Sequence, residues 1–239
     1  MRLKPWARFG ALALAIVLAA EPVIAAPIGT GGTSDIARTA LLLTLLAVLP
    51  AILVSMTGFI RIIVVLAMIR HAFGMPETPP NSVLISLALF LTAFTMSPTF
   101  SILNRDAVQP LLAGRIGAEQ AVKAGSRPLR DFMLAQTRDA DIEAIYAISK
   151  SPLPQTPEQV EILKLTPAFI LNELRVSFTI GFVVLLPFLL IDLVVSSILL
   201  SLGMMMVPPT TISLPIKLLM FVLIDGWRLI LEGVLGSFH

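Results

Sequence analysis

The sequence contains no cysteine, and its two histidines are His71 and His239. Disulfide bonds, iron–sulfur clusters and zinc sites with thiolate ligands are therefore excluded. A metal centre built from several histidines of one chain is excluded as well. A single tyrosine and an aromatic content of 7% leave no row of rings on which nucleic-acid bases could stack. We accordingly expect no metal site and no nucleic-acid partner.

Charged residues are also scarce. They make up 13% of the 239 residues, whereas an average soluble protein has about 25%. Hydrophobic residues account for 56% of the chain, and the mean hydropathy is +0.93. So large an apolar fraction cannot all be kept from water by one small domain, which predicts contact with lipid or with partner proteins. The formal net charge of +2 is too small to attract nucleic acid.

The N-terminus has the pattern of a secretory signal peptide. Arg2, Lys4 and Arg8 precede a purely apolar run at 11–20, and small residues lead up to a predicted cleavage site after Ala25. An uncleaved anchor is the alternative, but ten apolar residues are too short to span a hydrocarbon core of about 30 Å. Cleavage leaves fourteen basic and fourteen acidic residues, so the basicity of the whole chain belongs to the signal peptide.

The rest of the chain alternates between apolar and polar segments. The predicted fold is all-α and membrane-associated, with four long apolar helical segments that form hairpins and a small polar helical insert, as the subunit of an oligomeric pore. The four apolar segments are 39–69, 81–103, 166–207 and 210–238. Its predicted parts are a cleaved signal peptide at 1–25, a flexible stretch at 26–38, a first apolar hairpin at 39–103, the polar insert at 104–165 and a second apolar hairpin at 166–239. The first apolar segment, 39–69, is too long for one span, and Pro50 or Thr57-Gly58 could break it.

The polar insert carries half of all the charges in the chain. Two sets of residues alternate with charged residues at helical spacing, which predicts a small, mostly helical domain exposed to water. They are Leu129, Phe132, Met133 and Gln136, and then Ile142, Ile145, Tyr146 and Ser149. Arg70 and His71 favour a cytoplasmic position for the turn at 70–80, and the insert then faces the periplasm.

The charges inside the apolar segments include Asp192, Lys217 and Arg61. Asp192 and Lys217 are placed at similar distances on either side of the loop between the third and fourth segments, so we expect them to meet, within one hairpin or between copies. A structural ion pair and a proton relay both remain open for them. Arg61 has no acidic residue in its own segment, which predicts a partner in another subunit or a side chain that faces water.

The loop between those two segments is unusual. Met204, Met205 and Met206 are consecutive, and Pro208 and Pro209 prevent a helix from continuing through the loop. A run of three methionines cannot be buried on one helix face. Because methionine is unbranched and polarizable, such loops from several copies could form a soft constriction, although core packing remains the alternative.

We find no catalytic or nucleotide-binding motif, so the chain is not expected to be an enzyme or to hold a cofactor. A membrane enzyme with Asp192 and Asp225 as a dyad is one alternative. Nearby Lys217 and Arg228 argue that these carboxylates are ionised instead. A small-solute transporter is another alternative, but the inverted repeats it predicts are not visible.

Several blocks resemble the FliP family of the flagellar type III export gate. These blocks are residues 49–74, 79–98, 127–142 and 191–227, and the last of them contains the sequence MMMVPP. The resemblance covers most of the chain that follows the signal peptide. A signal peptide favours a flagellar member over a homologous injectisome export-gate subunit of virulence type III secretion.

The resemblance implies an assembly of several copies, five in the family, with FliQ and FliR in the bacterial inner membrane at the flagellar basal body. It implies further contacts with FlhB and FlhA and a pore for unfolded flagellar subunits. Met204, Met205 and Met206 match the residues that line a gasket around the passing chain. Asp192 and Lys217 match a charge pair important for assembly or gating. The hairpins of the family pack largely against other subunits, above the membrane, which would explain the overlong first segment.

Overall fold

The computed structural model describes residues 43–44, 47, 50–52, 54–75 and 77–238. The predicted signal peptide, its cleavage site after Ala25 and the stretch 26–38 lie outside these residues. The chain divides into two units between Leu49 and Pro50. In the first unit the described residues 43, 44 and 47 are helical. Everything below concerns the second unit.

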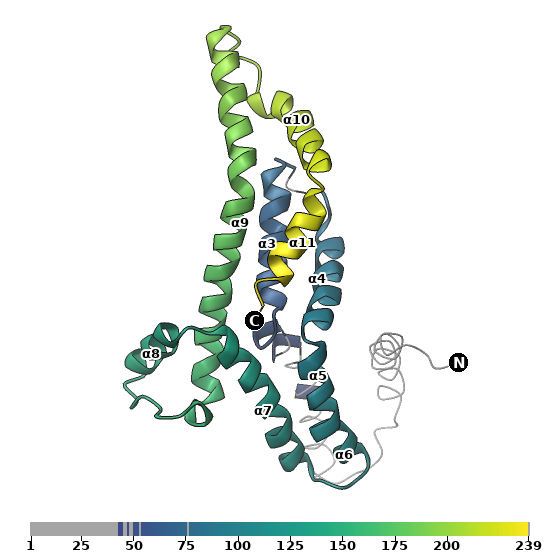
Figure 1. Ribbon diagram of the computed structural model, residues 1–239, viewed down its shortest axis with the longest axis vertical. Helices are drawn as coiled ribbons and strands as arrows, with labels where there is room; N and C mark the ends of the chain where they lie inside the picture. The colour runs from purple at the N-terminus through teal and green to yellow at the C-terminus, as the bar shows by residue number, and fades with distance from the viewer. Residues whose placement is uncertain (1–42, 45–46, 48–49, 53, 76, 239) are drawn as a thin grey trace, which may run out of the picture. The chain divides into compact units, whose positions relative to one another are not determined.

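All regular secondary structure in the described residues is helical, which confirms the predicted all-α class (Figure 1). In chain order the helices are α3 (Phe59–Ala72), α4 (Asn81–Thr95), α5 (Ser97–Leu103), the π-helix η1 (Asn104–Val108), α6 (Gln109–Leu112), α7 (Ala118–Gln136), α8 (Asp139–Ile148), the 3-10 helix η2 (Pro157–Gln159), α9 (Ile162–Ser201), α10 (Pro209–Leu223) and α11 (Gly226–Leu235).

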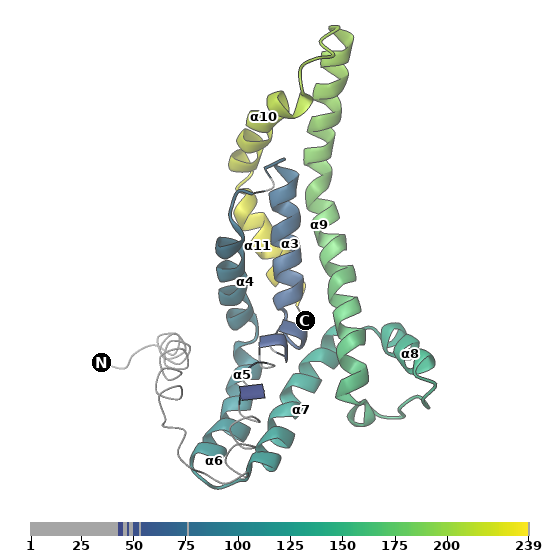
Figure 2. The ribbon, with the colours of Figure 1, turned by 180° about the vertical axis from the view of Figure 1, so that it is seen from behind.

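Helix α3 is the central helix of the main core. Its side chains pack against α4, α9, α10 and α11, and Figures 1 and 2 show α3 between α4 and α9 in both views. Gly181 allows α9 to come close to α3, because a Cβ at this position would lie 2.3 Å from Sδ of Met68. The turn at 56–58 separates α3 from the helical residues 54–55 before it, so the break expected at Thr57-Gly58 is confirmed.

Two of the predicted apolar segments are broken where the sequence predicts continuous helix. The segment 81–103 bends by 66° at Met96, between α4 and α5. Pro98 lies in the first turn of α5, where its missing N–H removes no helical hydrogen bond. The segment 210–238 breaks at Asp225, whose left-handed backbone (φ 51°, ψ 53°) ends α10 and starts α11 in a new direction.

The third apolar segment forms a single helix, α9, of 40 residues, which is about 60 Å long. Pro187 lies inside α9 and does not interrupt it. Among the described residues, α9 is the one helix that is both long and apolar enough to cross a membrane. The bent pair of α4 with α5 and α6 adds a second candidate if it counts as one span, whereas α10 is too short. Four straight spans are therefore not present in this part of the chain.

The polar insert has its own small core against the first turns of α9. Met133 of α7 and Ile142 and Tyr146 of α8 are buried there against Leu165 and Phe169 of α9. These residues belong to the two sets that alternate with charges in the sequence, so the predicted helices of the insert are confirmed. The insert is anchored on α9 and thereby fixes the N-terminal end of the long helix.

Candidate functional site

The loop that carries the three methionines is held at both ends by local backbone geometry. Gly203, which has a φ of 74°, closes the C-terminal end of helix α9. The N–H of Gly203 donates to the carbonyl of Leu200 (3.1 Å), and the N–H of Met204 donates to the carbonyl of Leu199 (2.9 Å). This is a Schellman motif, which needs a residue that tolerates the left-handed conformation. At the other end, Pro208 is extended and Pro209 is the first residue of α10. The tip is thus a short loop fixed between two helices.

The three methionine side chains are turned away from the rest of the chain. Met204 is 45% exposed, Met205 is 80% exposed and Met206 is 97% exposed. Met205 and Met206 are thus mostly uncovered by the described residues, whereas Met204 is about half covered. Core packing within a single copy, the alternative interpretation of these methionines, does not fit this exposure.

Further down the same hairpin, Asp192 of α9 and Lys217 of α10 form an ion pair. Lys217 Nζ lies 2.6 Å from Asp192 Oδ2 and also donates a hydrogen bond to the carbonyl of Ala72 at 3.0 Å. The other carboxylate oxygen, Asp192 Oδ1, accepts a hydrogen bond from the Ser213 hydroxyl at 2.6 Å. The structure thus brings together, within one chain, the two residues that the sequence expects to meet.

This polar contact joins three helices. Ala72 is the last residue of α3, and its carbonyl has no further turn of helix to bond to. The ammonium group of Lys217 provides that missing donor and at the same time compensates the negative end of the α3 dipole. The hairpin that carries the methionine loop is therefore tied to the C-terminal end of α3.

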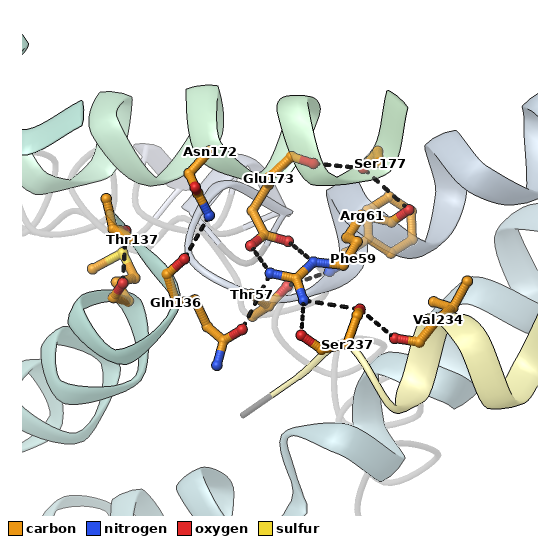
Figure 3. Close-up of polar contacts among 11 residues, drawn as sticks. Thr57, Phe59, Arg61, Gln136, Thr137, Asn172, Glu173, Ser177, Val234 and Ser237 are labelled. Atoms are coloured by element: carbon orange, nitrogen blue, oxygen red, sulfur yellow. Dashed lines mark hydrogen bonds and ion pairs between the residues drawn. The ribbon is translucent and has the colours of Figure 1, made fainter. Parts of the chain in front are cut away.

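A second ion pair lies in the core, between Arg61 of α3 and Glu173 of α9 (Figure 3). The side chains of both residues are at most 2% exposed. Arg61 Nε lies 2.9 Å from Glu173 Oε2, and Nη2 bonds to both Glu173 Oε1 and Gln136 Oε1 of α7. The guanidinium group therefore connects three helices from inside the protein.

The segment after α11 completes the surroundings of Arg61. Arg61 Nη1 donates to the carbonyl and to the hydroxyl of Ser237, at 2.7 and 3.0 Å, and the guanidinium carbon lies 4.1 Å from the centre of the Phe238 ring. Phe238 also lies over Gly58, where an added Cβ would come within 2.6 Å of the ring. A buried arginine needs all of its donors satisfied, and this arrangement satisfies Nε, Nη1 and Nη2.

The position of Arg61 corrects one expectation from the sequence. A partner in another subunit or a water-facing side chain was predicted, because no acidic residue lies in the same apolar segment. The partner is Glu173, 112 residues further along the same chain, and Arg61 is 1% exposed. Nothing in the spacing of the sequence indicates this pair, since it depends on how α3 packs against α9. Helix α9 has two acidic residues, Glu173 and Asp192, and because Asp192 was assigned to Lys217, Glu173 was the available signal.

Asp192 and Asp225, the two carboxylates that the alternative enzyme hypothesis pairs as a dyad, lie in surroundings that differ from each other. Asp192 is bound to Lys217 and Ser213, whereas Asp225 is exposed at the junction of α10 and α11. No hydrogen bond joins these two carboxylates in the part of the chain that the structure describes. A protonated carboxyl dyad, which this hypothesis requires, does not fit a carboxylate paired with an ammonium group.

The comparisons with known proteins agree with one another. The model of the FliP family matches residues 42–234, a range that includes both ion pairs and the methionine loop. A flagellar biosynthetic protein FliP from Pectobacterium carotovorum subsp. carotovorum is 48% identical over 219 residues, which are 91% of this chain and 85% of that protein. The FliP of Caulobacter vibrioides is 46% identical over 88% of this chain and 79% of its own length. The FliP of Bacillus subtilis (strain 168) is 44% identical over 86% of this chain and 93% of its own length.

Proposed function

The chain belongs to the FliP family and is thus a component of the flagellar export apparatus, and we propose that it is a pore-forming subunit of that apparatus. Several copies, five by resemblance, assemble with FliQ and FliR and contact FlhB and FlhA. The assembly stands in the bacterial inner membrane, within the flagellar basal body. Unfolded flagellar subunits pass through its centre. The names of the matched relatives favour the flagellar apparatus over the injectisome alternative.

The exposed methionine loop carries this proposal. Met204, Met205 and Met206 from each copy meet at the centre of the assembly and close the pore as a gasket. Their side chains change conformation easily, so the same ring seals against itself when idle and around a passing chain during export. The hydrocarbon surface excludes water and ions without selecting for particular substrate side chains. The role is not enzymatic, and the energy for export comes from other components.

The arrangement of the helices supports the same proposal. The apolar side chains of α9 and α10 that are exposed in one copy are covered by neighbouring copies, by partner proteins and by lipid. The polar insert at 104–165 faces the periplasm, and the signal peptide is removed after Ala25. Pro208 and Pro209 keep the loop in its position. Asp192 and Lys217 hold the loop-bearing hairpin in the orientation needed for assembly and gating.

Ion conductance tests the gasket directly. The triple variant Met204→Ala, Met205→Ala and Met206→Ala, reconstituted as the complete complex in a planar bilayer, should leak ions severalfold more than the native complex. The matched variant with leucine at the three positions keeps apolar volume and should leak little. Leu202→Ala, which removes an exposed apolar side chain just before the loop, is the control and should leave the leak unchanged. An equal leak in the native and triple-alanine complexes would overturn the gasket.

A further inference from the structure

The insert has opposite charges on two of its helices. Helix α7 carries Lys123, Arg127 and Arg130 along one side, where they line a groove of about 610 Å³ beside the connector at 157–158. Helix α8 carries three carboxylates and no basic residue. One of these carboxylates, Asp141, faces inward and pairs with Arg175 of α9 at 2.5 Å. The other two, Asp139 and Glu143, are exposed.

The exposed charges are not used within the chain. Neither Lys123 nor Arg127 makes an ion pair or a side-chain hydrogen bond with any other described residue, and the same holds for Asp139 and Glu143. Each set has like charges four residues apart, which destabilises a helix by a few tenths of a kcal/mol. Asp139 gains some compensation from its position in the first turn of α8. Lys123 and Arg127 have carboxylates four residues away on α7, Glu119 and Asp131, which offset part of this repulsion without forming an ion pair with them. For Glu143, folding of one copy supplies no such neighbour on α8.

One copy cannot pair these two sets with each other. Helices α7 and α8 diverge from the short connector at 137–138 and lie on opposite sides of the first turns of α9 (Figures 1 and 2). Lys123 is thirteen residues before the last residue of α7, which is about 20 Å of helix. A salt bridge from Lys123 or Arg127 to α8 of the same copy would have to span this separation.

We infer that the basic groove of α7 binds α8 of a second copy of this chain, through Lys123 and Arg127 on one copy and Asp139 and Glu143 on the other. The charges in each set are four residues apart, about 6 Å along a helix, so the two sets match in spacing. The groove is lined by three basic residues, Lys123, Arg127 and Arg130, and by two carboxylates, Asp131 and Glu158, so its lining has a net charge of +1.

The contact has a definite geometry. It joins two different surfaces, so it is a head-to-tail contact that repeats from copy to copy and closes into a ring or continues as a helix. Charge complementarity of this kind fixes the register between copies and excludes a contact of α7 with α7. The inference rests on the proposed function in one respect, namely that several copies assemble.

Charge reversal tests the contact. Lys123→Glu with Arg127→Glu should reduce the multi-copy complex by at least about tenfold, because like charges then face each other across the contact. Asp139→Lys with Glu143→Lys should do the same. The fourfold variant, with both sets reversed, should restore assembly. The copy number is measured by native mass spectrometry of the complex in detergent.

Cross-linking gives a second measurement that does not depend on the reversed variants folding. The chain contains no cysteine, so any disulfide between copies must join cysteines that are introduced. Ala124→Cys with Ala140→Cys, which leaves every charge in place, should form a ladder of disulfide-linked copies under mild oxidation. Ser101→Cys, on the exposed side of α5, combined with Ala140→Cys is the control and should give monomers.

The two possible failures are distinguishable. Two results would show that this contact is wrong while the pore proposal stands. The first is that the reversed variants assemble as well as the native chain. The second is that the fourfold variant fails to assemble and the cysteine variant also forms no ladder. If the native chain forms no multi-copy complex at all, the pore proposal fails together with the contact.

Discussion

Two ion pairs, Arg61–Glu173 and Lys217–Asp192, each join a carboxylate of α9 to a buried basic residue of another helix, but their surroundings differ. Arg61 and Glu173 are enclosed on all sides, and the guanidinium group is bound by three separate parts of the chain. In the other pair Lys217 is buried, but the side chain of Asp192 is 32% exposed. Closure of the first site from all sides makes it a fixed part of the core. The second site has an open side, and it lies in the hairpin that carries the methionine loop.

A charge in an apolar segment therefore does not by itself indicate a functional site. Arg61 belongs to the structure that holds α3, α7 and α9 together, and moving it would break many contacts at once. Two hydrogen bonds, from Ser213 and from Lys217, reach Asp192 within the hairpin, and only the bond from Lys217 to the carbonyl of Ala72 ties the hairpin to the end of α3. A contact with so few bonds and one side open can break and form again without unfolding the core.

The largest effect is expected at the enclosed pair. Arg61→Met leaves Glu173 buried without its partner, and removal of one partner of a buried ion pair destabilises a protein by about 3–5 kcal/mol. Thermal unfolding of the purified protein in detergent, followed by circular dichroism, should show a large drop in the transition temperature. Arg228→Met is the control, because its pair with Glu232 is exposed and joins residues four apart on one helix, where such a pair contributes little to stability. Equal shifts in the two variants would show that enclosure makes no difference.

A smaller effect on folding and a larger one on export are expected at the open pair. Asp192→Ala removes the carboxylate, and Lys217 keeps its bond to the carbonyl of Ala72. The loss of hydrogen bonds to charged groups destabilises by about 1.5–3 kcal/mol. Export of flagellar subunits, measured in the culture medium, should fall more than the amount of folded protein does. Loss of folded protein in proportion to export would make this pair purely structural.

Exchange of the two charges sharpens the same test. Asp192→Lys with Lys217→Asp recreates an ion pair, but it places a carboxylate against the Ala72 carbonyl where an ammonium group had donated a hydrogen bond. Export should therefore recover in part and not fully. Ser213→Ala, which removes one neutral partner of Asp192, should reduce export less than Asp192→Ala does. Complete absence of recovery would argue against direct pairing in the working complex.

The smallest effect is expected at the partly exposed pair of the insert. The hydrogen bond from Arg175 lowers the pKa of Asp141 below its ordinary value of 3.8. Because this pKa is depressed by folding, the pair stabilises the protein above about pH 3.8 and the contribution is lost as the pH falls below that value. Asp141→Asn should therefore destabilise by at most about 1 kcal/mol at neutral pH, since the guanidinium side is open to water.

A pH series measures that difference. The unfolding temperatures of the native chain and of Asp141→Asn should converge as the pH is lowered below 3.8. Arg175→Gln should converge with the native chain over the same range, and the double variant should be no worse than either single one. A gap that stays constant with pH would assign the effect to packing rather than to the charge of Asp141.

Contacts could be predicted from the sequence where the residues involved are connected by regular helix and a short loop, because their relative positions then follow from helix geometry. Asp192 and Lys217 lie at similar distances from the methionine loop, so a helical hairpin necessarily brings them to similar depth. The break at Thr57-Gly58 and the amphipathic helices of the insert follow from local residue chemistry and periodicity in the same way. Family membership was also recognisable, because the MMMVPP block is specific.

Predictions were wrong or incomplete where distant parts of the chain decide the outcome. The bend at Met96 and the break at Asp225 were not predicted because both lie within long apolar runs, although Ser97-Pro98 and Asp225-Gly226 are dipeptides that favour turns. The pairing of Arg61 with Glu173 depends on two helices 112 residues apart in the sequence. Its closure by Ser237 and Phe238 adds a third segment from the end of α11. Such contacts depend on packing in three dimensions.

By itself, the sequence determined the helical class, the scarcity of surface charge, the family and a loop of three methionines that a helix cannot bury. These are consequences of composition, periodicity and backbone restriction by proline, which act over a few residues. Only the tertiary structure decided which charge is enclosed and which stays open. The surroundings of a charge are formed by helices that come together in space, and the free energy of a buried ion depends on all of them at once.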